Sequence, residues 1–241
     1  MLNGGPGATG RGASAHRVGP GPAQARRAAV LIAVAALIGF TVLTVVVLGL
    51  GVDGWDRAAL RAVERLHGRS LTKAVKIITA LGSLDLVAPL TIVVVGAAMV
   101  LRRPRAAALV VLAVVGADLL QLGLKPLFDR PRPQVFRHLE QVGSAAYPSG
   151  HAIVSAALAF ALVAICWRRP WRAAAASAAT VYVIAVGFSR IYLGVHYPSD
   201  VLGGWLLAAA WVSTLCAALG PVLRRNGTRT AAGEAQGGPG T

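Results

Sequence analysis

The chain has 241 residues, of which 56% are hydrophobic and only 14% are charged, and its formal net charge is +15. The apolar residues come in long blocks rather than in amphipathic stripes, which excludes an ordinary soluble domain and favours a polytopic helical membrane protein. The positive charge could suggest a nucleic-acid binder. However, the arginines gather at the ends of the apolar blocks, so we expect no nucleic acid among the partners.

The two ends of the chain lack any pattern of a packed core. The N-terminal end is rich in Gly, Ala and Pro, and the C-terminal end is polar and rich in Gly. Such segments cannot bury enough apolar surface to offset the entropy of ordering. We predict disordered tails at residues 1–24 and 224–241 around one membrane domain at residues 25–223.

Six apolar blocks follow one another between these tails, and a helix needs roughly 20 such residues to cross a bilayer. The first block is long and uninterrupted; the others are shorter or carry an isolated polar residue, yet charge or proline bounds each one. We therefore predict an all-α bundle of six transmembrane helices. The blocks are Ala28–Leu50, Ile77–Leu101, Ala106–Leu124, Ala152–Trp167, Ala173–Phe188 and Val201–Leu219.

The segment Asp53–Lys76, between the first and second blocks, has an amphipathic pattern. This pattern predicts an external helix that lies against the lipid interface. Its apolar face would be formed by Trp55, Leu60, Val63 and Leu66.

Arginines mark alternate ends of the predicted spans, before the first span and after the second, fourth and sixth. The positive-inside rule places these ends in the cytoplasm of a multi-pass plasma-membrane protein. Both tails are then cytoplasmic. The marking residues are Arg26, Arg27, Arg102, Arg103, Arg105, Arg168, Arg169, Arg172, Arg224 and Arg225.

Three short polar segments interrupt the apolar pattern: Lys125–Pro133, Pro148–His151 and Ser189–Asp200. Successive spans run in opposite directions across the membrane, starting from a cytoplasmic N-terminus. This alternation places all three segments at the outer ends of spans three to six. They supply cations that can bind an anion, one imidazole that can attack and another that can donate a proton, an inventory typical of phosphoryl transfer.

Local spacing supports this chemistry. Ser149 and Gly150 stand directly before an apolar helix, whose first N–H groups form an anion site. His196 and Asp200 are four residues apart, so at the start of a helix the carboxylate can orient the imidazole and stabilise its cation.

The three segments resemble the signatures of the type-2 phosphatidic acid phosphatase family: K-x6-R-P, P-S-G-H and S-R-x5-H-x3-D, in that order and without a departure. The resemblance implies that His196 is a nucleophile forming a phosphohistidine and that Asp200 is its partner. It implies that His151 is the general acid and then the base for water. No metal ion or other cofactor is expected. The implied phosphate-binding residues are Lys125, Arg132, Ser149, Gly150 and Arg190.

The favoured function is hydrolysis of a terminal phosphate from a lipid phosphate or diphosphate, because a pocket at span ends lies level with lipid headgroups. A lipid-phosphate transporter or flippase-like carrier would need the cations but not the paired histidines. A phosphotransferase of the same fold is a further alternative.

Several lipids present the same reacting group. We favour polyprenyl diphosphate, such as undecaprenyl diphosphate, over phosphatidic acid, phosphatidylglycerol phosphate or a polyprenyl-phosphosugar phosphate. This preference rests only on family analogy and the inferred outer face. The roles of Asp85, Asp118 and Arg130 and the oligomeric state stay open.

Overall fold

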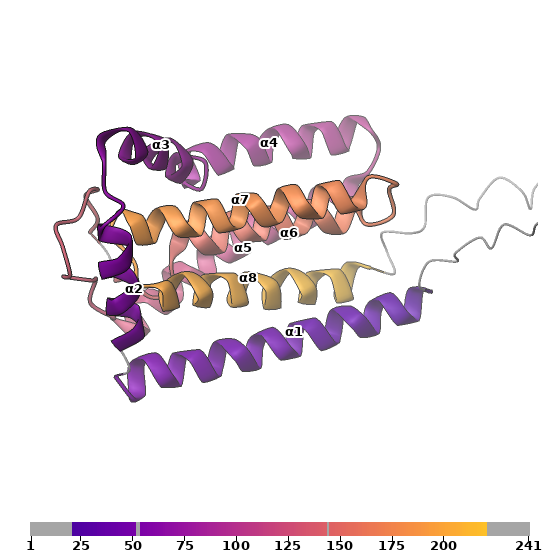
Figure 1. The fold of residues 1–241 in the computed structure, drawn as a ribbon. Helices are drawn as coiled ribbons and strands as arrows, with labels where there is room; N and C mark the ends of the chain where they lie inside the picture. Colours follow the sequence, from indigo (N-terminus) through magenta and orange to yellow (C-terminus); the bar gives the residue numbers. More distant parts are fainter. Residues whose placement is uncertain (1–20, 52–53, 144, 221–241) are drawn as a thin grey trace, which may run out of the picture.

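The computed structural model describes residues 21–51, 54–143 and 145–220, and this part of the chain contains only helices and loops (Figure 1). The predicted all-α fold is therefore confirmed. The predicted tails lie outside the described residues, except that the first helix already begins at Pro22. The helices are α1 (Pro22–Thr44) with the π-helical turn η1 (Val45–Gly49), α2 (Gly54–Glu64), α3 (Arg69–Ala80), α4 (Leu84–Val100), α5 (Pro104–Phe128), α6 (Gly150–Cys166), α7 (Arg172–Tyr192) and α8 (Pro198–Leu219).

The long helices run roughly parallel to one axis, and α2 lies across one end of the bundle (Figure 1). Helix α6 occupies the centre, where it packs against α5, α7 and α8, while α1 packs against α8. All residues from Ala152 to Ala159 on α6 are buried. Four of these eight are alanines, and small side chains let neighbouring helices approach closely. The core is therefore built around α6.

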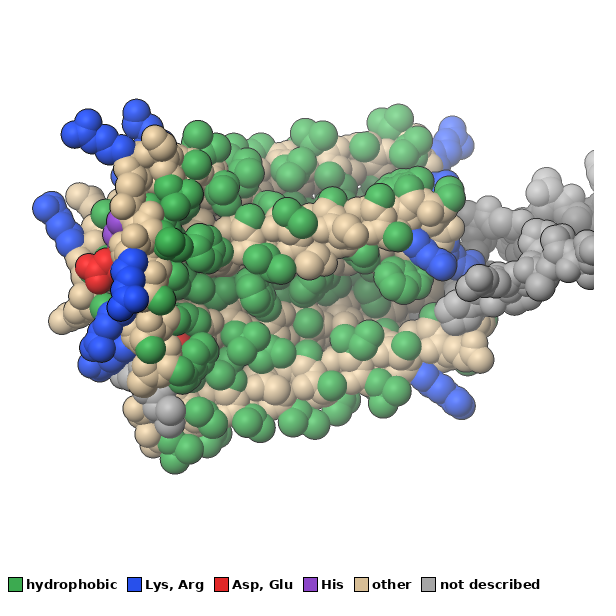
Figure 2. Space-filling model, in the orientation of Figure 1, with side chains coloured by type: hydrophobic (Ala, Val, Ile, Leu, Met, Phe, Trp, Pro, Cys, Tyr) green, Lys and Arg blue, Asp and Glu red, His purple; other side chains and the backbone are tan. Residues whose placement is uncertain are grey.

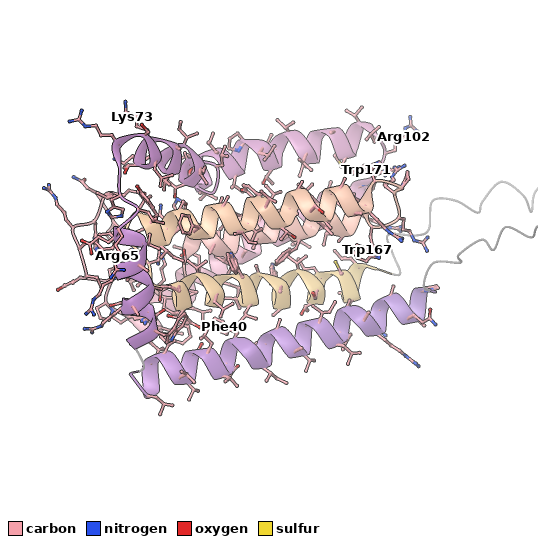
Figure 3. All side chains as sticks on the ribbon, viewed as in Figure 1. Phe40, Arg65, Lys73, Arg102, Trp167 and Trp171 are labelled. Carbon is pink, nitrogen blue, oxygen red and sulfur yellow. The ribbon has the colours of Figure 1, made fainter. Side chains whose placement is uncertain are left out.

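The outer surface is apolar along most of the bundle and carries Lys and Arg at both ends (Figure 2). Exposed apolar side chains include Leu31, Ile92 and Val181. Soluble proteins rarely expose so much contiguous apolar surface, whereas a bilayer requires it. Arg65 and Lys73 lie at the end crossed by α2, and Arg102, Trp167 and Trp171 lie at the opposite end (Figure 3). Such bands of charge and tryptophan are typical of membrane–water interfaces.

Four described segments are long and apolar enough to cross a membrane: residues 22–49, α5, α7 and α8. Helices α3 and α4 meet the same criterion only as a pair, bent by 46° at the break between them. Helix α6 is apolar but has 17 residues, a length of about 26 Å at 1.5 Å per residue. The chain is thus a multi-pass membrane protein, and the count of six spans stays a prediction.

The predicted second block, Ile77–Leu101, is not one continuous helix. Helix α3 ends at Ala80, and α4 begins at Leu84 after a short turn. Within the turn, Gly82 packs so closely on α7 that an added Cβ would lie 2.3 Å from Val186 Cγ1. The close contact between this turn and α7 requires glycine, which explains where the block breaks.

The predicted external helix at Asp53–Lys76 is also wrong in detail, because it consists of α2 and the larger part of α3. Asp53 lies outside the described residues. Leu60 is fully buried and Val63 packs onto a small core with Tyr192, whereas Trp55 and Leu66 are exposed. The apolar face of α2 therefore lies against the protein, where α2 contacts α7 and α8, and not against lipid as predicted.

Candidate active site

The structure brings the three polar segments together at the end of the bundle that α2 crosses. The α5–α6 loop is joined to the α7–α8 loop, because Arg132 Nη1 donates to the Val195 carbonyl at 2.6 Å. The start of α6 is joined to the start of α8, because the Ser149 N–H donates to the Asp200 carbonyl at 3.1 Å. Residues that are far apart in sequence therefore form one polar cluster.

His196 lies in the short loop between α7 and α8. The loop turns at Gly194, whose φ of +76° favours glycine and whose added Cβ would lie 2.5 Å from the Phe136 ring. The imidazole is almost completely buried, and its Nδ1 lies 3.4 Å from Asp200 Oδ2. The imidazole and the carboxylate four residues later therefore lie close together, but Nδ1 has no hydrogen-bond partner within the described structure.

The other ring nitrogen of His196 faces a cation. Arg132 Nη1 lies 3.3 Å from His196 Nε2, and a guanidinium can only donate. This contact suits the tautomer whose proton is on Nδ1, facing Asp200. Burial, followed by the positive charges of Arg190, Arg132 and Lys125, holds the pKa of His196 well below its ordinary value. The imidazole is therefore neutral near pH 7, with the Nε2 lone pair directed toward the cationic side of the site.

Two groups hold the Asp200 carboxylate by hydrogen bonds. It is the third residue of α8, and its Oδ2 accepts a hydrogen bond of 2.8 Å from the Tyr197 N–H, which caps the helix start. Its Oδ1 accepts a hydrogen bond from Arg130 Nη1. Asp200 is fully buried, so this carboxylate has a fixed orientation.

The start of α6 carries Ser149, Gly150 and His151. Ser149 is fully buried, and within the described structure its Oγ has no hydrogen-bond partner. The start of α6 packs so tightly on α8 that a Cβ added to Gly204 would lie 3.0 Å from the Ser149 carbonyl oxygen. The first N–H groups of α6 therefore have a rigid position beside the cluster.

Arg190, at the end of α7, is 2% exposed and has two partners. Its Nη1 donates to Glu140 Oε2 at 2.8 Å and to Thr79 Oγ1 at 2.7 Å, while its Nε has no partner among the described residues. Glu140 comes from the α5–α6 loop and is 33% exposed. A carboxylate at the rim of the site thus pairs with the cation that the signature assigns to phosphate.

His151 is less deeply buried than His196 and lies within electrostatic reach of it and of Arg190. It lines a cavity of about 530 Å³ between the α3–α4 break and the α5–α6 loop. Lys125 is part of the same charged group, since its charge acts on both histidines. The cavity gives His151 access to a molecule that enters from the rim. Its other lining residues are Lys76, Thr79, Ala80, Ser83, Asp85, Leu139, Glu140 and Gln141.

The sequence interpretation missed several members of this cluster: Asp56 on α2, Thr79 on α3, Glu140 in the α5–α6 loop and Ser199 on α8. The sequence did contain a signal for Asp56, because its spacing places it on the same helix face as Leu60 and Val63. An acidic residue on that apolar face is expected to point toward the protein. The sequence interpretation also left the role of Arg130 open. In the structure, the guanidinium of Arg130 lies between Asp56 and Asp200.

Asp118 and Gln121, the polar pair inside α5, interact within one helix, where the Gln121 amide donates to Asp118 at 3.0 Å. The sequence left the role of Asp118 open, and the structure gives it a hydrogen-bond partner on its own helix. Among the described residues, no three His, Cys, Asp or Glu side chains gather as they would to hold a metal ion.

Comparison with known proteins gives the family. A family model described as the PAP2 superfamily matches residues 106–221. Phosphatidylglycerophosphatase B of Bacillus subtilis (strain 168) is 36% identical over 163 residues, which cover 65% of this chain and 79% of that protein. The undecaprenyl-diphosphatase of Sulfolobus acidocaldarius is 38% identical over 69 residues, which cover 29% of this chain and 31% of that protein.

Two solved structures share the fold. The PAP2-type phosphatidylglycerolphosphate phosphatase from Bacillus subtilis aligns with a TM-score of 0.73 and 26% identity, covering 80% of this chain and 98% of that one. LpxE from Aquifex aeolicus aligns with a TM-score of 0.54 and 23% identity, covering 65% of this chain and 90% of that one. The match to most of the Bacillus phosphatase agrees with the signatures in the sequence, and the chain belongs to the PAP2 superfamily of membrane phosphatases.

Proposed function

We propose that this membrane lipid phosphatase removes the terminal phosphate of a lipid diphosphate or lipid phosphate through a phosphohistidine on His196. One observation carries the proposal: Ser149 Oγ and Arg190 Nε are buried polar atoms without a protein partner among the described residues, and both belong to signature positions. An unsatisfied buried polar group costs about 1–3 kcal/mol. A phosphate oxygen would satisfy both atoms, beside the Nε2 lone pair of His196.

In the first step, His196 Nε2 attacks phosphorus and the bond to the leaving oxygen breaks. His151 donates its proton to that oxygen, which leaves as the lipid alcohol or as the lipid monophosphate. The phosphorylated imidazole is cationic, and the carboxylate of Asp200 stabilises it. Negative charge on the equatorial oxygens is stabilised by cations and N–H donors, here from Lys125, Arg132, Ser149, Gly150 and Arg190.

In the second step, His151 removes a proton from water, whose oxygen attacks phosphorus. The bond between phosphorus and Nε2 breaks, and inorganic phosphate leaves. One histidine thus acts first as acid and then as base. Donating its proton in the first step leaves the neutral imidazole that the second step needs, and the proton from water restores the acid.

The cavity beside His151 is the proposed site of the leaving group. Lys76 lines it together with Asp85 and Glu140, so a cation is present where the second phosphate of a diphosphate would lie. The favoured substrate is polyprenyl diphosphate, whose second phosphate Lys76 would bind, in line with the named activity of the Sulfolobus relative. The name of the Bacillus relative makes phosphatidylglycerol phosphate the main competitor.

Phosphate release from a panel of lipids tests the substrate and the chemistry together. Purified protein in EDTA would be given each candidate lipid, alongside Arg132→Gln and the matched control Arg137→Gln. Arg137 is exposed in the same loop. We expect the highest kcat/KM with polyprenyl diphosphate, a large loss in Arg132→Gln and none in Arg137→Gln. Lipid binding without phosphate release would contradict the proposal and favour a carrier.

The site is proposed to face the extracytoplasmic side, with both tails in the cytoplasm. Cysteine labelling tests this orientation in a background where Cys166 and Cys216, the two native cysteines, are replaced by serine. A cysteine at Gln141 should react with an impermeant maleimide in intact cells, and one at Ala173 should react only after lysis; both native side chains are exposed. The reverse pattern would move the site to the cytoplasm.

A further inference from the structure

A buried network connects α2 to the carboxylate that faces His196. Asp56, on α2, is fully buried, and its Oδ2 accepts a hydrogen bond of 2.9 Å from Arg130 Nη2. The other arm of the same guanidinium, Nη1, donates to Asp200 Oδ1 and, at 2.7 Å, to Ser199 Oγ. Arg130 therefore bridges two carboxylates that lie 144 residues apart in the chain.

Further contacts fix this bridge on every side. Asp56 also accepts from the Ser199 N–H at 3.0 Å and from the Ser199 hydroxyl at 2.5 Å, so it caps the start of α8 from a neighbouring helix. The Arg130 guanidinium lies over the Tyr197 ring at 4.2 Å from its centroid. The guanidinium can hardly move without displacing α2 or the loop that carries His196.

The charges in this network are balanced with respect to Asp200. Although burial opposes it, the carboxylates of Asp200 and Asp56 raise the pKa of Arg130, which stays charged. Two carboxylates and one guanidinium leave one net negative charge. Without Asp56, Arg130 alone would cancel the charge of Asp200. With it, Asp200 keeps a negative charge to offer the imidazole.

We propose that Asp56 and Arg130 are positioning residues for the phosphoryl transfer, which hold Asp200 in place and preserve its negative charge toward His196. The inference rests on the proposed role of His196 as nucleophile. Neither residue touches the substrate in this scheme, so both act through Asp200. The amphipathic helix α2, which lies across the end of the bundle, thereby becomes part of the catalytic apparatus.

The test uses the pH dependence of single-turnover phosphoenzyme formation in the purified full-length protein. The charged groups that face His196 are Asp200 from α8, Asp56 from α2 through Arg130 of the α5–α6 loop, Arg132 of the same loop, Arg190 from α7, Lys125 from α5 and His151 from α6. Asp56→Asn removes a negative charge and Arg130→Gln removes a positive one. The rate should fall at low pH, on the acid limb of the pH–rate profile, as His196 becomes protonated. Loss of a nearby negative charge disfavours this protonation, so the acid limb should move to lower pH in Asp56→Asn. Loss of a nearby positive charge favours it, so the acid limb should move to higher pH in Arg130→Gln.

Both variants should lose about 10- to 100-fold in kcat, with little change in KM; this is the size of the loss when residues that orient the ligands of a metal site are replaced. The matched control is Glu64→Gln, the same charge change on the exposed side of α2, which should leave the rate and the acid limb unchanged. Rates are compared per folded protein, measured by near-UV circular dichroism. A merely structural role would lower the folded fraction and leave the acid limb in place.

If Asp56→Asn does not fold, the double variant Asp56→Asn/Arg130→Gln removes both charges and leaves neither buried alone. Its acid limb should lie below that of Arg130→Gln. An unchanged rate per folded molecule, or shifts of Asp56→Asn and Arg130→Gln in the same direction, would overturn the inference. Absence of a wild-type phosphoenzyme on His196 would instead overturn the proposed function.

Discussion

Two buried arginines near His196 have different kinds of partners. Arg190 is 2% exposed and pairs with Glu140, which is 33% exposed at the rim. Arg130 is 5% exposed and pairs with Asp56 and Asp200, which are both fully buried. Water or an incoming anion can reach Glu140, but neither can reach the partners of Arg130.

The difference separates an arginine that can exchange its partner from one that cannot. A phosphate can replace Glu140 beside Arg190, because the displaced carboxylate can turn into solvent. Removing Arg130 from its carboxylates would leave buried charges unpaired, which is strongly unfavourable. Both arginines belong to polar segments of the same chain, yet one is suited to bind substrate and the other to support the site.

The largest expected effect is on stability. Arg130→Ala leaves Asp56 and Asp200 buried without their shared cation, and we expect a loss of about 3–5 kcal/mol in the free energy of unfolding. Arg190→Ala should cost clearly less, since Glu140 can hydrate. Thermal unfolding of the two variants in the same detergent measures the contrast. Equal losses would remove the distinction between the two arginines.

The second effect is on activity. Arg190→Gln should lower kcat/KM by roughly 10²–10³-fold, as removal of one donor to a developing oxyanion does, while the protein remains folded. Steady-state kinetics with the best lipid of the panel would measure it, with Arg137→Gln as the control. A near wild-type rate would show that Arg190 serves the fold alone.

The third effect concerns pH. Because burial and nearby cations lower the pKa of His196, the folded protein keeps this imidazole neutral at pH values where an exposed histidine is protonated. The acid limb of kcat/KM should therefore lie below the ordinary histidine pKa of about 6.5. Below about pH 6.5, His196 is protonated in the unfolded chain but stays neutral in the folded protein. The free energy of unfolding should therefore decrease as the pH drops below this value. An acid limb at or above that value would contradict this environment.

The fourth effect is tighter binding of inorganic phosphate. Glu140→Gln removes the carboxylate that competes for Arg190, and inorganic phosphate should then inhibit at a concentration about three- to fivefold lower. The size follows from partly exposed ion pairs, which contribute about 1 kcal/mol at most. Product-inhibition assays measure it, with Glu64→Gln as a control. Weaker inhibition in Glu140→Gln would mean that Glu140 supports phosphate binding.

The smallest expected effect is that of a chelator. In the proposed mechanism the cations of the site take the role that magnesium plays in other phosphoryl-transfer enzymes. Activity should therefore be unchanged in EDTA, whereas vanadate should inhibit. Loss of activity in EDTA and its return with magnesium would count against the mechanism.

Sequence reasoning succeeded where the signal was local. His196 and Asp200 are four residues apart around a helix start, and this spacing predicted that they lie close together; Nδ1 is 3.4 Å from Asp200 Oδ2, although His196 itself precedes α8. The arginine clusters and the alternating direction of the spans predicted that three distant segments lie at one end of the bundle, and hydrogen bonds join these segments in the structure. The α3–α4 break was missed because the need for Gly82 comes from Val186 on another helix.

The two ion-pair partners were missed for a similar reason. Asp56 meets its partners only after α2 has packed across the bundle end, and Glu140 lies in a loop without any periodic pattern. Long-range pairing of polar side chains depends on tertiary packing, which local propensity and spacing do not report. The prediction of lipid contact for Leu60 was wrong for the same reason. An amphipathic helix has the same sequence pattern whether its apolar face packs against protein or against the membrane.

The central claim is that His196 carries the phosphoryl group. Its most direct test is rapid acid-free quenching of the purified protein with a ³²P-labelled lipid substrate, followed by peptide mapping. The account predicts an acid-labile, alkali-stable phosphoenzyme on His196 in the wild-type protein, and neither phosphoenzyme nor turnover in His196→Ala. Substantial turnover by His196→Ala, or label on a different residue, would contradict it.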